Sequence, residues 1–254
     1  GVFLAAVTVV FFVSAAYLCL LLISEYLGLI VYFAASGLIL KLSFAVRSME
    51  THAVPVAEAL EGGDITKARK LVSLIVRRET SALNREQVIS ATVESVAEGT
   101  VDGVGSPLFY FASLGVPGAV AYRVINTLDS MVGYEDRRYK HLGFFSAWLD
   151  TVCNFIPSRI VAVLMVLAAA FLGENWRGAW RILKRDRNNT ESRNAGYPMS
   201  AMAGALNVQL EKLGFYQLGD NSEILTHNHI YRSLRIMKVT VYLFILLIVT
   251  PLSF

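Results

Sequence analysis

The sequence predicts an all-α fold: a polytopic helical integral membrane protein whose amphipathic helices and polar loops form an active site at the membrane surface or within it. Of its 254 residues, 55% are hydrophobic and 17% are charged, whereas about 25% of the residues of a soluble domain are charged. The apolar residues also gather in runs of roughly the 20 residues that cross a bilayer core. We therefore expect a single membrane-embedded domain over residues 1–254, placed as a multi-pass protein in the plasma membrane.

Two transmembrane segments are predicted at the start, at about 1–23 and 27–46. The first, "GVFLAAVTVVFFVSAAYLCLLLI", contains no charge and lacks the basic flank of a signal peptide. The second carries Lys41 near its end, where a lysine side chain can reach the interface. The short connection "SEY" makes the two segments a helical hairpin.

Residues 47–100 mix charged and apolar positions at helical spacing, which predicts two or three amphipathic helices outside the hydrocarbon. Gly62 and Gly63 interrupt the pattern, and Asp64 is a suitable N-cap for the next helix.

Three further apolar runs predict membrane segments at 107–121, 155–172 and 236–254. The first of these, "PLFYFASLGVPGAVA", contains two prolines and two glycines. It is therefore expected to be a broken span, a re-entrant segment or a buried loop.

Lysine and arginine are concentrated in two long loops, with eight in 41–106 and nine in 173–235. The positive-inside rule places both loops on the cytoplasmic side, which requires an even number of crossings between them. Residues 122–154 then face the opposite side or line a cavity within the membrane protein.

Glu94, Glu98 and Asp102 are spaced four residues apart, which aligns them on one helix face. They form either a solvated acidic face or, because the next segment is apolar, a functional set that offers oxygen ligands to magnesium. Spacing alone leaves both readings open.

Three polar blocks adjoin the later apolar runs. The block "NTLDSMVGYEDRRYK" (126–140) mixes carboxylates with arginines, which bind phosphate or carboxylate through two parallel hydrogen bonds. Asp150, Asn154 and Arg159 follow at the mouth of a span, and "LKRDRNNTESRNAGYPMSAMAGAL" (183–206) adds further arginines. The alternatives are an exposed loop with surface ion pairs for the first block and a positive-inside loop for the last.

Several classes of site are not predicted. The net charge of +3 is too small to suggest a nucleic-acid partner. Cys19 and Cys153 form no zinc or disulfide pattern, and no P-loop or Rossmann glycine motif is present.

Three stretches resemble the integral-membrane adenosylcobinamide-phosphate synthase family of cobalamin biosynthesis. They are "ESVAEGTVDGVGSPLFY" (94–110), "AYRVINTLDSMVGYEDRRYKHLGFFSAWLDTVCNFIPSR" (121–159) and "NAGYPMSAMAGAL" (194–206). The resemblance covers most of residues 50–210. It implies an ATP-dependent ligase that uses magnesium to join adenosylcobyric acid, a corrinoid, to aminopropanol phosphate through an amide bond.

The resemblance also marks positions for site residues. Catalytic roles are expected for Glu94, Glu98, Asp102 and Asp129, and magnesium ligation for Glu98, Asp102 and Asp129. Substrate binding is expected for Arg123, Asn126, Thr127, Ser130, Tyr134, Arg137, Asp150, Asn154, Arg159, Arg185, Asp186, Arg193 and Asn194.

Family members carry a stretch with an "HP" motif before the first hairpin, so we expect that a short N-terminal segment is lacking from this chain. The expected partners are the two substrates and the lipid bilayer, and the resemblance leaves open a homo-oligomer or an assembly with other late enzymes of the pathway. The alternative functions are a membrane sensor of the β-lactamase-induction type, without catalysis, and a small transporter. A transporter would more often contain an internal repeat, and none is found.

Overall fold

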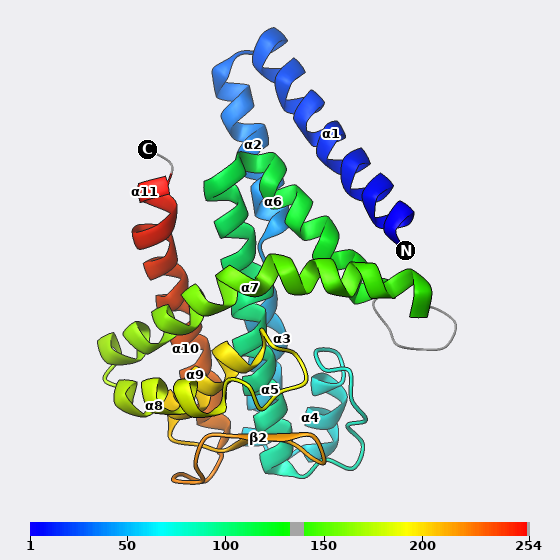
Figure 1. Cartoon of the computed structure of the whole chain (residues 1–254). Coiled ribbons are helices and arrows are strands. Elements are labelled where there is room, and N and C mark those ends of the chain that lie inside the picture. Colours follow the sequence, from blue (N-terminus) through cyan, green and yellow to red (C-terminus); the bar gives the residue numbers. More distant parts are fainter. Residues whose placement is uncertain (133–139, 253–254) are drawn as a thin grey trace. The chain divides into compact units, whose positions relative to one another are not determined.

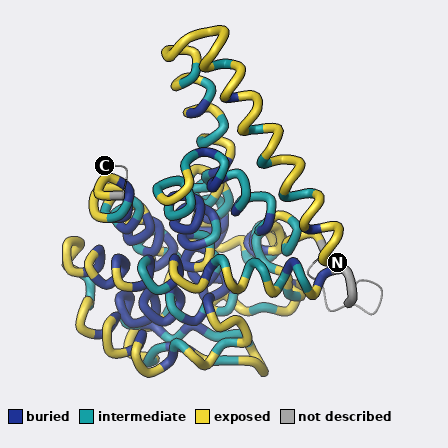
Figure 2. The backbone as a smooth tube through the Cα atoms, turned by 45° about the horizontal axis from the view of Figure 1, so that its top comes forward, coloured by how far each residue is buried: buried dark blue, intermediate teal, exposed yellow. Residues whose placement is uncertain are grey.

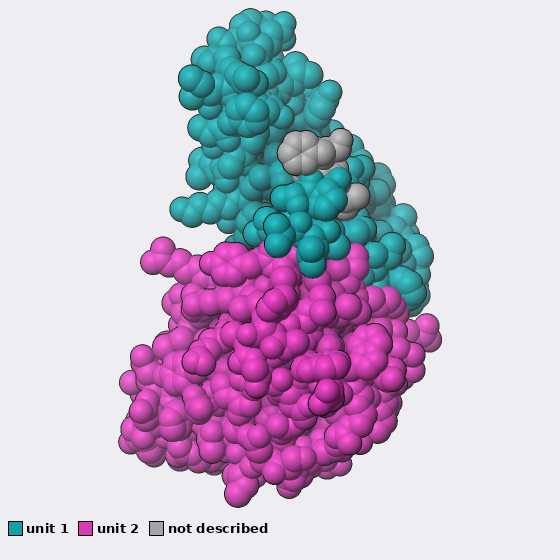
Figure 3. Space-filling view, turned by 90° about the vertical axis from the view of Figure 1, so that its left-hand side faces the viewer, with its two compact units in different colours: residues 1–44, 102–157, 245–254 teal, residues 45–101, 158–244 magenta. Residues whose placement is uncertain are grey.

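The computed structural model describes residues 1–132 and 140–252, whose contacts form two compact units (Figures 1 and 3). Unit 1 contains residues 1–44, 102–157 and 245–254, and unit 2 contains residues 45–101 and 158–244. The predicted single domain over residues 1–254 stays a prediction.

Unit 1 is built from apolar helices. Its elements are α1 (Val2–Tyr26), α2 (Leu29–Ser43), the π-helix η1 (Val101–Gly105), α6 (Ser106–Val132), the first part of α7 (Lys140–Phe171), the π-helix η2 (Ile245–Val249) and α11 (Thr250–Leu252). α1 packs against α6 and α2, yet most of its residues are exposed (Figure 2). A helix that exposes apolar side chains over most of its surface is typical of one that faces lipid.

Among the described residues, four helices are long and apolar enough to cross a membrane. They are Val2–Tyr26, Leu29–Glu61, Arg85–Met131 and Gly143–Phe171. In the third, the uncharged stretch is 103–122. The predicted fold class, a helical membrane protein, is therefore confirmed.

The last predicted segment, 236–254, runs through α10 (His227–Phe244), η2 and α11. It is not among these four helices, and its final residues, 253–254, lie outside the described part of the chain.

Helix α6 is interrupted at Gly115, two residues before Pro117. Gly115 has a φ of 67° and a ψ of −161°, a conformation that is costly for any residue with a Cβ atom. The interruption lies inside the segment 107–121.

Unit 2 contains shorter amphipathic helices and one hairpin. Its elements are α3 (Val46–Glu61), α4 (Ile65–Val72), α5 (Arg85–Thr100), the second part of α7, α8 (Trp176–Asp186), α9 (Gly196–Leu206), β1 (Leu210–Lys212), β2 (Tyr216–Leu218) and α10. Helix α5 packs against α3, α9, α10 and β1. Asp64 caps α4 as expected, because its side chain accepts a hydrogen bond from the Lys67 backbone N–H at 2.9 Å.

The contact between α8 and α9 depends on two glycines. A Cβ atom on Gly204 would lie 2.4 Å from the backbone oxygen of Gly178. The two backbones can approach this closely only because both residues lack a side chain.

Unit 2 unites the two basic loops that the lysine and arginine count places on one side of the membrane. Helices α3 and α5 come from the first loop, and they pack against α9 and α10 from the second part of the chain. The even number of crossings between the two loops stays a prediction.

Candidate functional site

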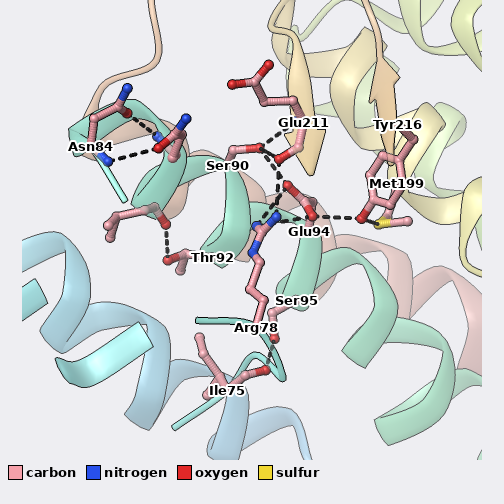
Figure 4. A network of polar contacts seen from close by, with 12 residues as sticks. Ile75, Arg78, Asn84, Ser90, Thr92, Glu94, Ser95, Met199, Glu211 and Tyr216 are labelled. Carbon is pink, nitrogen blue, oxygen red and sulfur yellow. Dashed lines mark hydrogen bonds and ion pairs between the residues drawn. The ribbon is translucent and has the colours of Figure 1, made fainter. Parts of the chain in front are cut away.

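Glu94 on α5 is the centre of a buried network in unit 2, which we name the Glu94 cluster: Arg78, Ser90, Glu94 and Tyr216 (Figure 4). Its Oε1 accepts hydrogen bonds from Ser90 Oγ at 2.6 Å and from Arg78 Nη2 at 3.3 Å. Its Oε2 accepts from Tyr216 Oη at 2.8 Å and from Arg78 Nη2 at 3.4 Å. The carboxylate therefore accepts hydrogen bonds from one cation and two hydroxyl groups.

The same cluster fixes the hairpin to α5. The Glu211 backbone N–H of β1 donates to Ser90 Oγ at 2.8 Å, and Arg78 Nη1 donates to the Glu211 backbone oxygen at 3.3 Å. Burial and the neighbouring Glu94 carboxylate raise the pKa of Tyr216 above its usual range, so Tyr216 acts as a neutral donor. Glu94 thus connects α5 to β2 and positions the residues around it.

Glu98 lies one helical turn after Glu94 and differs from it in exposure. The residue reaches solvent. Protein around its carboxyl group and, next, the Glu94 carboxylate nevertheless raise the pKa of Glu98 to about 7, while Lys212, Arg77 and Arg78 act in the opposite direction. An accessible carboxylate among cations can bind a metal ion or accept a proton from an ammonium group.

The regular spacing of the predicted acidic face ends at Thr100. From Val101 to Gly105 the backbone is a π-helix, which has a wider turn than the α-helix. Asp102 lies in this π-helix and belongs to unit 1, whereas Glu94 and Glu98 belong to unit 2.

A second group in unit 2 surrounds an aromatic ring, and we name it the Tyr197 cluster: Arg159, Arg187, Asn194 and Tyr197. The guanidinium carbons of Arg159 and Arg187 lie 4.3 Å and 5.6 Å from the centre of the Tyr197 ring. Arg159 Nη1 also donates to Asn194 Oδ1 and to Ser158 Oγ, at 3.3 Å each. Two cations at the start of α9 create a positive potential that suits a phosphate or carboxylate group.

Arg185 and Asp186, both predicted to bind substrate, form an ion pair with each other, and Arg185 also binds Asp220. The two Arg185–Asp186 hydrogen bonds are 2.6 Å and 2.8 Å long, and Arg185 Nη1 reaches Asp220 Oδ1 at 2.7 Å. Burial alone would raise the pKa of Asp186, but the hydrogen bonds from Arg185 and the Gly219 backbone N–H outweigh it and lower that pKa. Arg193, also predicted to bind substrate, is exposed.

Unit 1 contains its own polar network, which we name the Asn154 cluster: Ser106, Tyr122, Asp150 and Asn154. Asn154 Oδ1 accepts from Ser106 Oγ at 2.5 Å and from Tyr122 Oη at 2.9 Å, while Asn154 Nδ2 donates to Asp150 Oδ2 at 2.9 Å. Asn126 Nδ2 extends the network to Asp150 Oδ1 at 3.2 Å. The amide thus connects α6 and α7 within an apolar unit.

The other predicted residues of unit 1 lie on α6. Arg123 Nη1 is 3.5 Å from Asn126 Oδ1, and Thr127 Oγ1 donates to the Arg123 backbone oxygen at 2.8 Å. Asp129 is partly exposed and Ser130 is exposed. Tyr134 and Arg137 lie outside the described residues.

Magnesium was predicted at Glu98, Asp102 and Asp129. Within residues 1–132 and 140–252, no group of three or more His, Cys, Asp or Glu side chains could hold a metal ion. Magnesium bound to a nucleotide needs only one or two protein carboxylates, because phosphates and water supply its other ligands. The magnesium site therefore stays a prediction.

The structure adds site residues that the sequence reasoning missed, namely Arg78, Ser90, Tyr122, Arg187 and Tyr216. Tyr216 is 122 positions from Glu94, so no local spacing connects the two. Arg187 lies within the polar block 183–206, which also contains Tyr197. An aromatic residue in an arginine-rich block is the sequence signal that could have indicated this contact.

The fold and these clusters define a class of protein: a helical membrane protein with a polar network in each of its two units. The chain belongs to the CobD/Cbib protein family, whose family model matches residues 1–237. This membership confirms the resemblance found in the sequence.

Curated relatives agree with the family. The probable cobalamin biosynthesis protein CobD of Methanothermobacter thermautotrophicus is 46% identical over 211 residues, covering 83% of this chain and 71% of that protein. The probable cobalamin biosynthesis protein CobD of Thermoplasma volcanium is 40% identical over 249 residues, covering 98% and 81%. The cobalamin biosynthesis protein CobD of Clostridium perfringens is 35% identical over 249 residues, covering 95% and 79%. No solved structure matches the chain.

Proposed function

We propose that this member of a cobalamin biosynthesis family is an ATP-dependent amide ligase that joins adenosylcobyric acid to aminopropanol phosphate. The carboxylate of the corrinoid attacks the γ-phosphorus of ATP, which gives an acyl phosphate and ADP. The amine then attacks the acyl carbon after losing a proton, and inorganic phosphate leaves. The product is adenosylcobinamide phosphate.

One observation carries this proposal. Arg159 and Asn194 come from two of the three stretches that resemble the ligase family, 35 positions apart, and they are hydrogen-bonded in unit 2. Arg187 lies beside the Tyr197 ring, as Arg159 does, and so adds a second cation to the cluster. The three side chains can hold an anionic group, and the amine substrate and the nucleotide both carry phosphate.

The acidic residues have a separate role in the proposal. Glu98 is accessible and lies in unit 2 with the Tyr197 cluster, so it is our candidate for accepting the proton of the amine or for holding magnesium. Asp102 and Asp129 remain candidates for the ion, and Glu94 positions the segment that carries Glu98. Magnesium, when bound, would neutralise charge on the phosphates.

The test is product formation by the purified, detergent-solubilised protein. Adenosylcobyric acid, aminopropanol phosphate, ATP and magnesium are supplied, and the new amide is measured by mass spectrometry together with ADP. Glu98→Gln is expected to lower kcat by about a hundredfold or more. The matched control is Glu86→Gln, which removes an exposed carboxylate from the same helix and is expected to leave turnover unchanged.

The Tyr197 cluster is tested in the same assay. Arg159→Gln and Arg187→Gln are each expected to lower kcat/KM by about tenfold or more, the effect of one hydrogen bond to a charged group. Arg85→Gln, an exposed arginine on α5, is the control. Absence of amide from well-folded protein would overturn the ligase proposal and favour the sensor, and equal activity in all variants would overturn the site.

The remaining features are proposed with the reaction. ATP and magnesium are the co-substrate and ion, and the corrinoid and aminopropanol phosphate are the substrates. The plasma membrane is the proposed location, because ATP and the two basic loops would then lie on the cytoplasmic side.

A further inference from the structure

Helix α8 has two different faces. Ala179, Ile182 and Leu183 are buried against the rest of unit 2, whereas Trp176 and Trp180 are exposed by 44% and 42%. Because these tryptophans are four positions apart, they lie one above the other along the helix. Exposed tryptophans in pairs are unusual on a surface that faces only water, and they are typical of a membrane interface.

The tryptophans follow a line of exposed apolar side chains. Val163, Leu167 and Phe171 repeat at every fourth position on the part of α7 that belongs to unit 2, and Phe171 is 75% exposed. α8 starts five residues after the end of this candidate span. The exposed tryptophans of α8 thus come directly after the exposed apolar residues of α7 in the chain. A membrane helix shows the same order, with apolar residues in the hydrocarbon followed by aromatic residues at the interface.

An ion pair connects the start of α8 to α10. Glu174, just before α8, accepts two hydrogen bonds from the Arg232 guanidinium, of 3.0 Å and 2.5 Å. Arg232 lies about one turn before residue 236, where the last apolar run starts. The first turn of α8 is therefore held next to the part of α10 that precedes residues 236–254.

The basic residues of α8 divide into two pairs. Arg181 and Arg185 bind Asp220, each at 2.7 Å. The Arg177 guanidinium carbon lies 5.1 Å from the centre of the Trp176 ring, and Lys184 Nζ lies 5.6 Å from the centre of the Trp180 ring. In the described part of the chain neither forms an ion pair, so both cations accompany the tryptophans and face outward.

We propose that the exposed side of α8, made of Trp176, Arg177, Trp180 and Lys184, binds the anionic headgroup layer of the bilayer. The tryptophan rings lie at the boundary between headgroups and acyl chains, and the two cations bind lipid phosphates. Unpaired cations beside aromatic rings complement a negatively charged surface. Unit 2 is then held against the membrane by its own surface as well as by its connections to the spans.

The depth of the tryptophans is the first test, and it uses the whole chain in lipid nanodiscs. The chain has three tryptophans, so Trp148→Phe combined with Trp180→Phe or Trp176→Phe leaves one reporter on α8. We expect lipids labelled with a quencher near the headgroup to quench each reporter at least twofold more than lipids labelled at the acyl end. Quenching by aqueous acrylamide without quenching by either lipid would overturn the proposal, as would strongest quenching from the acyl end.

The charge preference is the second test. Nanodiscs of mixed phosphatidylglycerol and phosphatidylcholine are used, and the lipids that stay with the protein are counted by native mass spectrometry. The R177Q/K184Q variant should lose phosphatidylglycerol enrichment by roughly fivefold for each charge removed, and less at high salt. K67Q/K70Q is the matched control, because it removes two exposed cations from α4 in the same unit.

The outcomes separate a lipid surface from other anion sites. Enrichment that is equal in the R177Q/K184Q variant and the unchanged protein would overturn the proposal. Loss of enrichment on adding millimolar inorganic phosphate at constant ionic strength would also overturn it, because the site would then bind free phosphate. Unfolding temperatures of the variants confirm that the exposed substitutions leave the fold intact.

Discussion

The Glu94 cluster of unit 2 and the Asn154 cluster of unit 1 use different chemistry to connect helices. The first is centred on a carboxylate that is compensated by Arg78 and two hydroxyl groups. The second is centred on a neutral amide, which accepts and donates hydrogen bonds at the same time. A charge at the centre requires an opposite charge nearby, whereas an amide is satisfied by neutral donors to its oxygen and acceptors of its N–H groups.

The difference matches the surroundings of each unit. Unit 2 contains most of the charged residues that the structure describes, so an arginine partner is at hand. Unit 1 is built from apolar helices, in which an uncharged centre limits the cost of desolvation. Removing the centre should therefore destabilise unit 2 more than unit 1.

The largest effect is expected for Glu94→Ala. The substitution leaves the Arg78 guanidinium, which is 17% exposed, without its carboxylate, and should cost about 3–5 kcal/mol of unfolding free energy. Thermal unfolding of the detergent-solubilised protein measures the loss, with the exposed Glu79→Ala as the control. If the unfolding free energy falls no more than in the control, water already hydrates the Arg78 guanidinium. The charged Glu94 cluster would then be no more sensitive to loss of its centre than the Asn154 cluster.

A smaller loss is expected for Asn154→Ala. Ser106 and Tyr122 lose their acceptor and Asp150 loses a donor, which should cost about 2 kcal/mol. The same unfolding measurement applies, with Val152→Ala on the exposed side of α7 as the control. A loss larger than that of Glu94→Ala would reverse the comparison.

Asp186 sharpens the comparison, because it is a buried carboxylate whose cation is half exposed. Asp186→Asn should cost about 1–2 kcal/mol at pH 7, since Arg185 is partly screened by water. The pKa of Asp186 is lowered in the folded protein, so its stabilisation is fully present above about pH 4, the unfolded value. It is lost as the pH falls through the lower folded pKa.

The measurement is the unfolding temperature across the acid range. The difference between the unchanged protein and Asp186→Asn should shrink as the pH falls below about 4. The exposed Glu61→Gln serves as the control. A difference that stays constant with pH would mean that the ionised carboxylate does not contribute.

The smallest effect is expected for an exposed amide. Asn84 and Gln87 form a capping box at the start of α5, with reciprocal hydrogen bonds of 2.9 Å. Asn84→Ala should cost about 1 kcal/mol, and Ser81→Ala nearby is the control. A cost equal to that of Asn154→Ala would show that burial adds nothing to an amide in this protein.

The sequence alone was sufficient for the features that depend on composition and local patterns. Apolar runs predicted the membrane helices, and Asp64 predicted a helix start. The motif residues Arg159 and Asn194 were both marked as substrate-binding, although their contact depends on how α7 and α9 pack. A sequence motif can therefore identify candidate site residues, but the packing of the helices decides which of these residues are in contact.

The rest required the tertiary structure. The four-residue spacing from Glu94 to Asp102 assumed a continuous α-helix, and the π-helix at Val101 changes that geometry. Glu94 and Glu98 carry the same side chain on one helix, yet one is buried and the other exposed. The hairpin that causes this difference lies more than 100 positions later, beyond the reach of any local pattern.

Unit 2 is assembled from two separate parts of the chain, and this has a consequence for biosynthesis. Residues 45–101 leave the ribosome first, but Glu211 and Tyr216 follow roughly 110 residues later, a delay of about 5–20 s at ordinary translation rates. During that delay Glu94 and Arg78 lack their hairpin partners, while the intervening apolar helices are being inserted. A ribosome stalled between residues 101 and 210 would therefore hold α3, α4 and α5 as an open surface, accessible to proteases and chaperones.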